Sequence, residues 1–534
     1  MRLKAIEVRN FRCFENLQLD IGGESLFIIG ANARGKSSLL KAIHHCVKGG
    51  QLSLEDFRDR EEPIELIATL SDLPAENQGL FRDAFDFNVA PPTLRVACRA
   101  TWNSQEQELK TEHLFPDNGW SRIGREARET LSIIYLPAWR DPKRLTAPAG
   151  SSSLLGGLIE GLPLEDELEE AVSAILRAGQ RLGDSEPLSN LLAEVGSELT
   201  KLIARVPAGA LSLGPVAREH SDVLRQLLLL LALDGPSIPI PAQSAGLAQA
   251  AIMALALRVV ATNPEALLLV DEPETALHPH AQRAVVQGIR EQAGQSLIAT
   301  HSSAVLDRSD PRLVARLEGG GPEAGTTVAR ATGMSDTAAR GLVRYATSLS
   351  AEAYFAEAVI FVEGFSDLLA LRTFAETLSV SLDSAGVSVI SLEGADSLKH
   401  YLALMGPNGL GLEVSGLCDL DHEEAWIARL QDVGINVTDR ASLNAAGFEV
   451  SNPDLEAELL SGLSEQEVTA VIAADGAERS FERFAQQPNN VGQATADLQL
   501  AFVKKDKIRW APLLAASIPA NVVPAPIAAL LARV

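Results

Sequence analysis

The pattern of apolar and polar residues predicts alternating strands and helices near the start of the chain. Residues 1–10 and 24–30 have the pattern of strands, and the second, ESLFIIG, is a short apolar run that ends in glycine. A helix is predicted from about Lys36 to Val47, and a β-rich stretch continues to about residue 136. The first part of the chain therefore has the order of an α/β domain.

The middle of the chain changes to helical periodicity. After a Gly/Ser/Pro-rich break at 147–158, two segments at 164–178 and 188–206 carry apolar residues at spacings of three and four with acidic faces. They predict a helical insertion or a dimer-forming bundle. The β/α pattern resumes at ALLLVDEPE (266–274) and again at 297–303, and a new series starts near residue 355.

Length and composition fit a multidomain globular protein. At 534 residues the chain should form three or four units of roughly 150 residues each. We place a boundary between about 330 and 350 and predict four segments, which are 1–148, 149–232, 233–340 and 341–534. The four cysteines are scattered without a CxxC pair, so we expect reduced thiols. The longest apolar runs are shorter than a membrane span and the N-terminus lacks a signal peptide pattern, so we expect a cytoplasmic protein.

The formal net charge of −24 argues against a surface that is basic all over. Binding of nucleic acid depends largely on basic groups that displace counterions from phosphate. A nucleic-acid partner of this chain must therefore meet a local basic patch or a bound metal.

The segment GANARGKSS, residues 30–38, matches the P-loop pattern between an apolar strand and a helix. Loop amides and the helix N-terminus would cradle phosphates, Lys36 would reach the β and γ phosphates, and Ser37 would bind magnesium. The predicted ATP-binding residues of this segment are Gly30, Asn32, Gly35, Lys36, Ser37 and Ser38.

A second part of the nucleotide site is predicted from the strands that follow. The apolar run before Asp271 predicts a buried strand that delivers this carboxylate to magnesium. Glu272 is placed to polarise the attacking water, so we assign it as the catalytic base. The segment LIATHSS predicts a strand ending in His301, whose imidazole would contact the γ phosphate.

A second constellation, of acidic residues, follows strands of the C-terminal part. In VIFVEGFSD (359–367) a strand ends at Glu363, and Asp367 lies about one helical turn later. A further strand ends near Glu393, and VSGLCDLDHEE predicts a third that carries Asp419 and Asp421 on one side by alternation. We expect Glu363, Asp367, Asp419 and Asp421 to converge at one sheet edge.

Clustered carboxylates repel one another unless cations neutralise them. Oxygen ligands suit Mg²⁺ or Mn²⁺, and the absence of histidine and cysteine from these four residues makes zinc a poor candidate. A site with two such ions can cleave phosphodiesters and can present positive charge to DNA, which answers the objection from net charge.

The N-terminal motifs resemble the ABC-type ATPases of the SMC and RecF kind. NFRCF (10–14), the P-loop, DEPETALHP (271–279) and THSS (300–303) occur in that family's order. Such ATPases pair two nucleotide domains across ATP, which implies a homodimer or higher even oligomer. SAGLAQ (244–249) is the nearest match to the family's signature loop, although it lacks one glycine. Ser244 and Gly246 would face the γ phosphate of the partner subunit.

The C-terminal motifs, E-G-x-x-D at 363–367 and D-x-D at 419–421, look like a Toprim domain. An SMC-like ATPase followed by Toprim resembles the OLD (overcoming lysogenization defect) family of ATP-dependent nucleases. The resemblance implies a Rossmann-like Toprim domain with a helical tail. It also implies further residues: Glu456, or alternatively Asp454, as a metal ligand, and Lys505 as a catalytic residue, with Lys504 and Lys507 as alternatives.

The resulting hypothesis is an α/β multidomain enzyme that binds ATP and cleaves DNA with Mg²⁺ or Mn²⁺. The resemblance implies a role in phage defence or DNA repair, and Gabija-type systems pair such a nuclease with a separate helicase. One alternative is a topoisomerase-like enzyme, which needs a nucleophile among Tyr135, Tyr345, Tyr354 and Tyr401. A second is an ATP-dependent DNA clamp or signalling switch whose acidic site is structural. An ABC transporter subunit fits less well, because the Toprim-like region has no role there.

Overall fold

The computed structural model forms two compact units by its internal contacts. The first contains Met1–Tyr135, Leu269–Glu272 and Gln295–Val534, and the second contains Leu136–Leu268 and Pro273–Gly294. The residues described are 1–150, 153–202, 219–233, 236–307, 309–319, 326–336, 339, 342, 351–392, 394 and 397–534. The predicted boundary near residue 340, Glu393 and part of the predicted insertion at 149–232 lie outside them. The four predicted segments stay predictions.

The first unit begins with an antiparallel sheet in the order β2-β1-β4-β6-β7-β8, with β5 paired to β6. Along β1 the buried Ile6 and Val8 alternate with more exposed residues, and a register shift between Leu3 and Ala5 separates them from the buried Leu3. The bounds are β1 Arg2–Phe11, β2 Phe14–Asp20, β4 Ile64–Ser71, β5 Phe85–Asp86, β6 Thr93–Asn103, β7 Glu108–Phe115 and β8 Ser121–Arg122. The expected β-rich stretch is confirmed.

A second sheet carries the nucleotide motifs. Its order is β15-β14-β3-β13-β12-β9, and β3 pairs in parallel with both β13 and β14. Helix α1, Lys36–Lys48, begins at the P-loop and buries Leu39, Ile43 and Val47. The strands are β3 Leu26–Ile29, β9 Ile133–Leu136, β12 Leu267–Asp271, β13 Gln295–Ala299, β14 Val314–Gly319 and β15 Thr326–Arg330. The strand predicted to reach His301 ends two residues earlier, at Ala299.

The second unit is mainly helical. Leu257 of α9 packs so closely on α10 that a Cβ at Gly288 would lie 2.9 Å from its Cδ1. Helix α9 is the one helix of the described residues that is long and apolar enough to cross a membrane, which is weak evidence because core helices pass the same test. The helices include α5 Leu154–Glu160, α6 Glu165–Gly183, α7 Glu186–Leu202, α8 His220–Arg225, α9 Ala245–Thr262 and α10 Pro279–Gln292.

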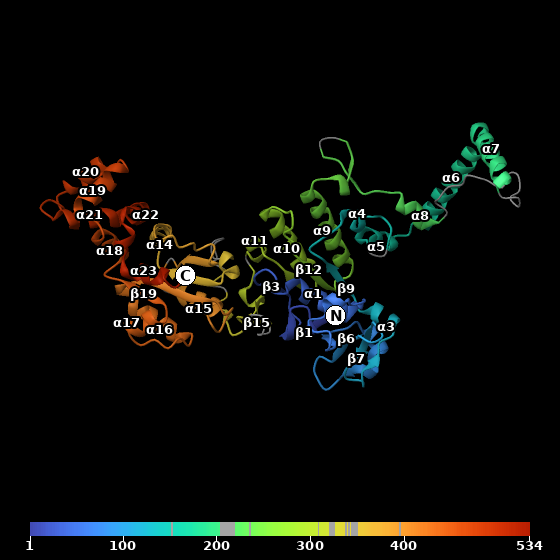
Figure 1. Cartoon of the computed structure of the whole chain (residues 1–534), viewed down its shortest axis with the longest axis horizontal. Helices are drawn as coiled ribbons and strands as arrows, with labels where there is room; N and C mark the ends of the chain where they lie inside the picture. The colour runs from blue at the N-terminus through green and yellow to red at the C-terminus, as the bar shows by residue number, and fades with distance from the viewer. Residues whose placement is uncertain are drawn as a thin grey trace. The chain divides into compact units, whose positions relative to one another are not determined.

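The C-terminal part of the first unit is built on a parallel sheet in the order β17-β16-β18-β19 (Figure 1). Its strands are β16 Ala358–Val362, β17 Val387–Ser391, β18 Glu413–Asp419 and β19 Phe448–Ser451. Helices α14 Phe365–Thr377 and α22 Lys507–Ser517 pack together over a core that includes Phe374 and Trp510. The remaining helices are α15 Leu398–Met405, α16 Glu423–Asp432, α17 Arg440–Ala445, α18 Leu455–Ser461, α19 Glu465–Ala474, α20 Glu478–Ala485, α21 Thr495–Val503 and α23 Ala525–Leu531.

One predicted strand is wrong at its end. β18 stops at Asp419, and a short 3-10 turn, Leu420–His422, follows. Because the turn rotates the chain, strand alternation no longer relates Asp421 to Asp419.

Candidate functional site

The P-loop takes the backbone conformation that its glycines permit. Gly30 and Gly35 have φ of 142° and 97°, which side chains rarely adopt. A Cβ at Gly35 would lie 2.4 Å from Cys13 Sγ, so glycine is also required by packing. The Lys36 ammonium donates hydrogen bonds to the carbonyl oxygens of Gly30, at 2.8 Å, and Ala31, at 3.0 Å. The lysine that should meet phosphate therefore already lies over the loop.

The structure brings Glu272 and His301 to the same place as Lys36. Asp271, at the end of β12, is 2% exposed. Glu272 has a φ of 49°, and its backbone N–H donates to Ala299 O at 2.8 Å. His301 Nε2 lies 3.7 Å from Glu272 Oε1. Burial and then the charge of Lys36 lower the pKa of the His301 imidazole, against the opposing effect of Glu272, so the ring is neutral at pH 7.

The signature-like residues lie in the second unit. Ser244 is exposed and precedes α9 as its N-cap, and a Cβ at Gly246 would lie 3.0 Å from Ala276 O. Their action across a partner's ATP stays a prediction, as do the roles of Asn32, Ser37 and Ser38.

Three strands of the C-terminal sheet deliver carboxylates to one edge. Glu363 follows β16, Asp419 ends β18, and Glu456 lies in the first turn of α18, just after β19. Neighbouring parallel strands present their carboxyl ends at the same edge. The Asp419 backbone N–H donates to Glu363 Oε1 at 3.1 Å, and Leu455 N–H donates to Asp419 Oδ1 at 3.2 Å.

Asp367 completes this acidic cluster, which we define as Glu363, Asp367, Asp419 and Glu456. Asp367 lies in the first turn of α14, is 8% exposed, and accepts the Gly364 N–H at 2.9 Å. Burial, then Glu456 and Glu363, raise the pKa of Asp367 to about 6. Burial, then Asp367, Glu363 and Glu456, raise the pKa of Asp419 to about 7. The four carboxylates are thus close enough to repel one another.

Asp421, the other predicted member of the cluster, is not among the carboxylates that raise the pKa values of Asp367 and Asp419. Its side chain is 79% exposed, and its Oδ1 is 3.5 Å from His422 Nδ1. His422 Nδ1 lies 2.7 Å from Glu363 Oε2, which makes it a site residue that the sequence analysis missed. Its position directly after the D-x-D motif could have identified it in the sequence. Burial works against protonation of His422, but its bond to Glu363 outweighs it and raises the pKa of the ring.

The three candidate lysines point to different partners. Lys507 Nζ lies 2.8 Å from Glu456 Oε2, and that carboxylate side chain is 1% exposed. Lys504 pairs with Asp454, the N-cap of α18. Lys505, the residue chosen from the resemblance, lies over the Phe484 ring at 4.1 Å from its centroid. Of the three, Lys507 contacts the acidic cluster.

Comparison with known proteins identifies both halves. Residues 25–307 match the family described as "AAA domain, putative AbiEii toxin, Type IV TA system". Residues 354–421 match the "Overcoming lysogenization defect protein-like, TOPRIM domain". The chain belongs to this AAA-domain family and carries an OLD-type Toprim domain. The resemblance to the OLD family and the predicted ATPase–Toprim fold are confirmed.

Curated relatives align over most of this chain. It is 23% identical to the OLD nuclease of Thermus scotoductus, over 73% of this chain and 77% of that protein. It is 21% identical to the Old nuclease of Escherichia phage P2, over 79% of this chain and 77% of that protein. Among solved structures, the C-terminal region of the Xanthomonas campestris OLD protein is 26% identical, covers 34% of this chain and 93% of its own, and has a TM-score of 0.29.

The acidic cluster of this Toprim domain has the chemistry of a divalent-cation site. Buried carboxylates with raised pKa values are relieved by a hard cation with oxygen ligands. Within the described ranges, no three Asp, Glu, His or Cys side chains are already arranged to hold a metal ion. Asp419 N–H donates to Glu363 Oε1 and His422 Nδ1 lies 2.7 Å from Glu363 Oε2, and each oxygen keeps a second lone pair that a cation could share.

The raised pKa values predict a pH-dependent stability for the metal-free protein. Asp367 and Asp419 ordinarily titrate near pH 4, so their protonated forms stabilise the fold below that pH. This contribution should be lost as the pH rises through about 6 and about 7, by on the order of a few kcal/mol. Melting in EDTA should therefore show a falling midpoint between pH 5 and pH 8, and Mn²⁺ should restore it at pH 8.

The matched control for this prediction is Asp419→Asn. The substitution keeps an acceptor for the Leu455 N–H and removes one charge. Its melting midpoint should fall less with pH than that of the wild type. Equal slopes for the two proteins would contradict the proposed repulsion.

Proposed function

We propose that this OLD-family protein is an ATP-dependent nuclease that hydrolyses phosphodiester bonds of DNA at the acidic cluster. The observation that carries the proposal is the meeting of Glu363, Asp367, Asp419 and Glu456 at one edge of the Toprim sheet. Two curated relatives are named OLD nucleases, which supports the same reaction. Bound Mg²⁺ or Mn²⁺ would activate water and stabilise the leaving oxygen.

The protein's own residues would orient the phosphate and control charge. Asp367, Asp419 and Glu456 would hold the cations, with Glu363 as a further ligand. We place Lys507 beside the scissile phosphate, because its ammonium lies against Glu456 at the edge of the cluster. Lys505 lies on an aromatic ring instead, so the catalytic role that the resemblance implies for it is the weaker alternative.

The N-terminal half would bind and hydrolyse ATP. Lys36 would bind the phosphates, Ser37 and Asp271 would hold Mg²⁺, and Glu272 would act as base, with His301 against the γ phosphate. Ser244 and Gly246 would complete the partner's site in a homodimer. Phage defence or DNA repair and a cytoplasmic location fit this activity, and a separate helicase partner has no support from the relatives.

Two of the four candidate tyrosines disfavour the topoisomerase alternative. Tyr354 and Tyr401 are 9% and 3% exposed, and burial raises the pKa of the Tyr354 hydroxyl. Tyr345 lies outside the described residues. A clamp with a structural acidic cluster remains the competing function, since it requires the same fold without cleavage.

Incubation with supercoiled plasmid tests the proposal. With Mn²⁺ or Mg²⁺ the protein should convert supercoiled DNA to nicked or linear forms, and EDTA should prevent this. A purified protein that binds plasmid but never cuts it in either metal would favour the clamp.

Two lysine variants sharpen the same assay. Lys507→Ala should slow cutting by about 10²-fold or more, because a charge at the reacting phosphate is lost. Lys505→Ala is the matched control, two residues away and exposed, and should change the rate by less than about 10-fold. The reverse order would return the catalytic role to Lys505.

A further inference from the structure

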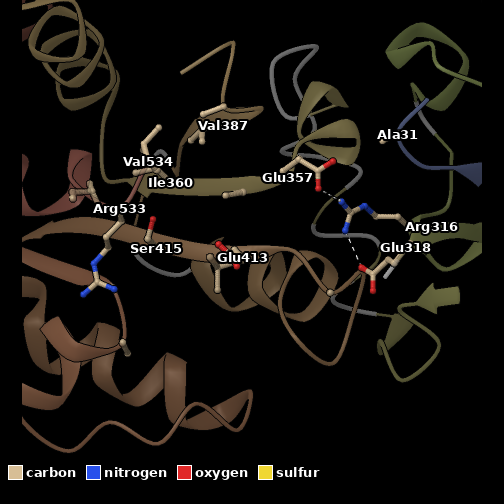
Figure 2. Close-up of a pocket in the computed structure, with 18 of the residues that line it drawn as sticks. Ala31, Arg316, Glu318, Glu357, Ile360, Val387, Glu413, Ser415, Arg533 and Val534 are labelled. Atoms are coloured by element: carbon tan, nitrogen blue, oxygen red, sulfur yellow. Dashed lines mark hydrogen bonds and ion pairs between the residues drawn. The ribbon is translucent and has the colours of Figure 1, made fainter. Parts of the chain in front are cut away.

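Strand β14 of the ATPase sheet carries an arginine that reaches the Toprim domain. The Arg316 side chain is 9% exposed, and its Nη1 lies 2.8 Å from Glu318 Oε1 on the same strand. Its Nη2 lies 3.5 Å from Glu357 Oε2, at the start of the Toprim domain. Figure 2 shows the guanidinium between these two carboxylates. One buried cation therefore contacts both domains.

Backbone carbonyls of the Toprim domain complete the binding of Arg316. Its Nη2 donates to Ala356 O at 3.0 Å, just before β16, and its Nη1 donates to Leu410 O at 3.4 Å, in the segment before β18. Gly411 follows, and a Cβ there would lie 2.5 Å from Glu318 Oε1. The contact thus reaches the beginnings of β16 and β18, the strands whose other ends carry Glu363 and Asp419.

The same strand is attached to the nucleotide loop. β14 pairs in parallel with β3, which leads into the P-loop, and Arg316 lies opposite Ile29. A Cβ at Gly30 would lie 2.6 Å from Leu317 O. Arg34 of the P-loop donates from Nη1 to Gly319 O at 3.1 Å. A movement of the P-loop on binding phosphate would therefore displace β14.

A cavity lies beside Arg316 at this junction. The cavity, of about 490 Å³, is lined by residues of both domains, among them Arg34, Glu318, Glu413 and Arg533. The ion pairs of Arg316 with Glu318 and Glu357 lie at the wall of this cavity (Figure 2). An interface that contains a cavity can change its geometry more easily than a close-packed one.

We propose that Arg316 is the positioning residue through which nucleotide at the P-loop acts on the Toprim active site. The inference rests on the proposed nuclease function and adds the route by which ATP regulates it. Arginine is suited to this position because its planar fork serves two carbonyls and two carboxylates at once, which lysine cannot do. The carboxylates of Glu318 and Glu357 are 31% and 57% exposed, and ion pairs with exposed partners add little stability, so a purely structural role explains the residue less well.

Gly319→Ala tests the route without changing a residue of the acidic cluster or a predicted ATP-binding residue. Its Cβ would lie 2.2 Å from Arg34 Nη1, so the Arg34 side chain must leave the Gly319 carbonyl. Gly124→Ala is the matched control, since a Cβ there meets nothing within 4 Å. Arg316→Lys is the second variant, because it keeps the charge and loses the fork. ATP affinity and cleavage without ATP should stay near wild type in all three.

Two readouts decide the result. The ratio of plasmid cleavage rates with and without ATP should depart from 1 in the wild type and in Gly124→Ala. In the wild type we expect a departure from 1 within the range of typical allosteric couplings, which is about 5- to 150-fold. In Gly319→Ala and Arg316→Lys the ratio should return to about 1. ATP should likewise change hydrogen exchange of residues 356–362 and 410–416 in the wild type and the control alone.

Different failures have different meanings. A wild-type response in both Gly319→Ala and Arg316→Lys would overturn the proposed route, and so would a wild type whose cleavage and exchange ignore ATP. Absence of cleavage in the wild type and in all variants would contradict the nuclease proposal instead. The hydrogen-exchange measurement would then still decide whether Arg316 transmits nucleotide binding.

Discussion

Asp419→Asn should reduce metal-dependent plasmid cleavage by at least about 10²–10³-fold while leaving ATP binding unchanged. Asp419 lies at the end of the central strand β18, and its pKa is raised by burial and by the other three carboxylates of the acidic cluster. Asparagine has the same shape and can still accept the Leu455 N–H, so the fold should be kept. The measurement is the initial rate of nicking in Mn²⁺ at saturating enzyme.

Asp421→Asn is the control within the same D-x-D motif. The Asp421 side chain is 79% exposed, so its loss should have a much smaller effect than that of Asp419. Equal losses from the two substitutions would show that Asp421 turns inward when cations bind, as the sequence predicted. Full cleavage by Asp419→Asn would remove the basis for the nuclease proposal.

The nucleotide half could be predicted well because its signals are local. A P-loop needs a strand, glycines and a helix N-terminus in immediate succession, and residues 26–48 supply all three. Strand ends also predicted the placement of Glu363 and Asp419, since parallel strands share a carboxyl edge. These inferences needed no knowledge of contacts between distant residues.

The remaining assignments failed or stayed open where local geometry changed. The prediction applied strand alternation beyond the end of β18, where a 3-10 turn begins. It therefore placed Asp421 on the same side as Asp419, which the structure does not bear out. The direction in which the Lys505 and Lys507 side chains point depends on the residue at which α22 begins, because each residue along a helix is rotated by about 100° from the one before it. His422 and Arg316 act through contacts with residues 59 and 40 positions away, which no local pattern reveals.

Lys36→Ala should abolish ATP hydrolysis and weaken nucleotide binding by about 10- to 100-fold or more. The ammonium lies 2.8 Å from Gly30 O and 3.0 Å from Ala31 O, over the loop where phosphates are expected. A hydrogen bond to a charged group contributes about 1.5–3 kcal/mol, and alanine removes the donor and its charge together. Binding of a fluorescent ATP analogue and release of phosphate provide the two measurements.

Lys41→Ala provides the matched control on the same helix, five residues further along α1 and beyond the P-loop. It should bind and hydrolyse ATP like the wild type. Because the acidic cluster is built from separate strands, Lys36→Ala should keep its metal-dependent cleavage in the absence of ATP and lose only the response to ATP. Loss of all cleavage in Lys36→Ala, with an unchanged melting midpoint, would mean that the Toprim site cannot act without nucleotide, and the two halves would then be one catalytic unit.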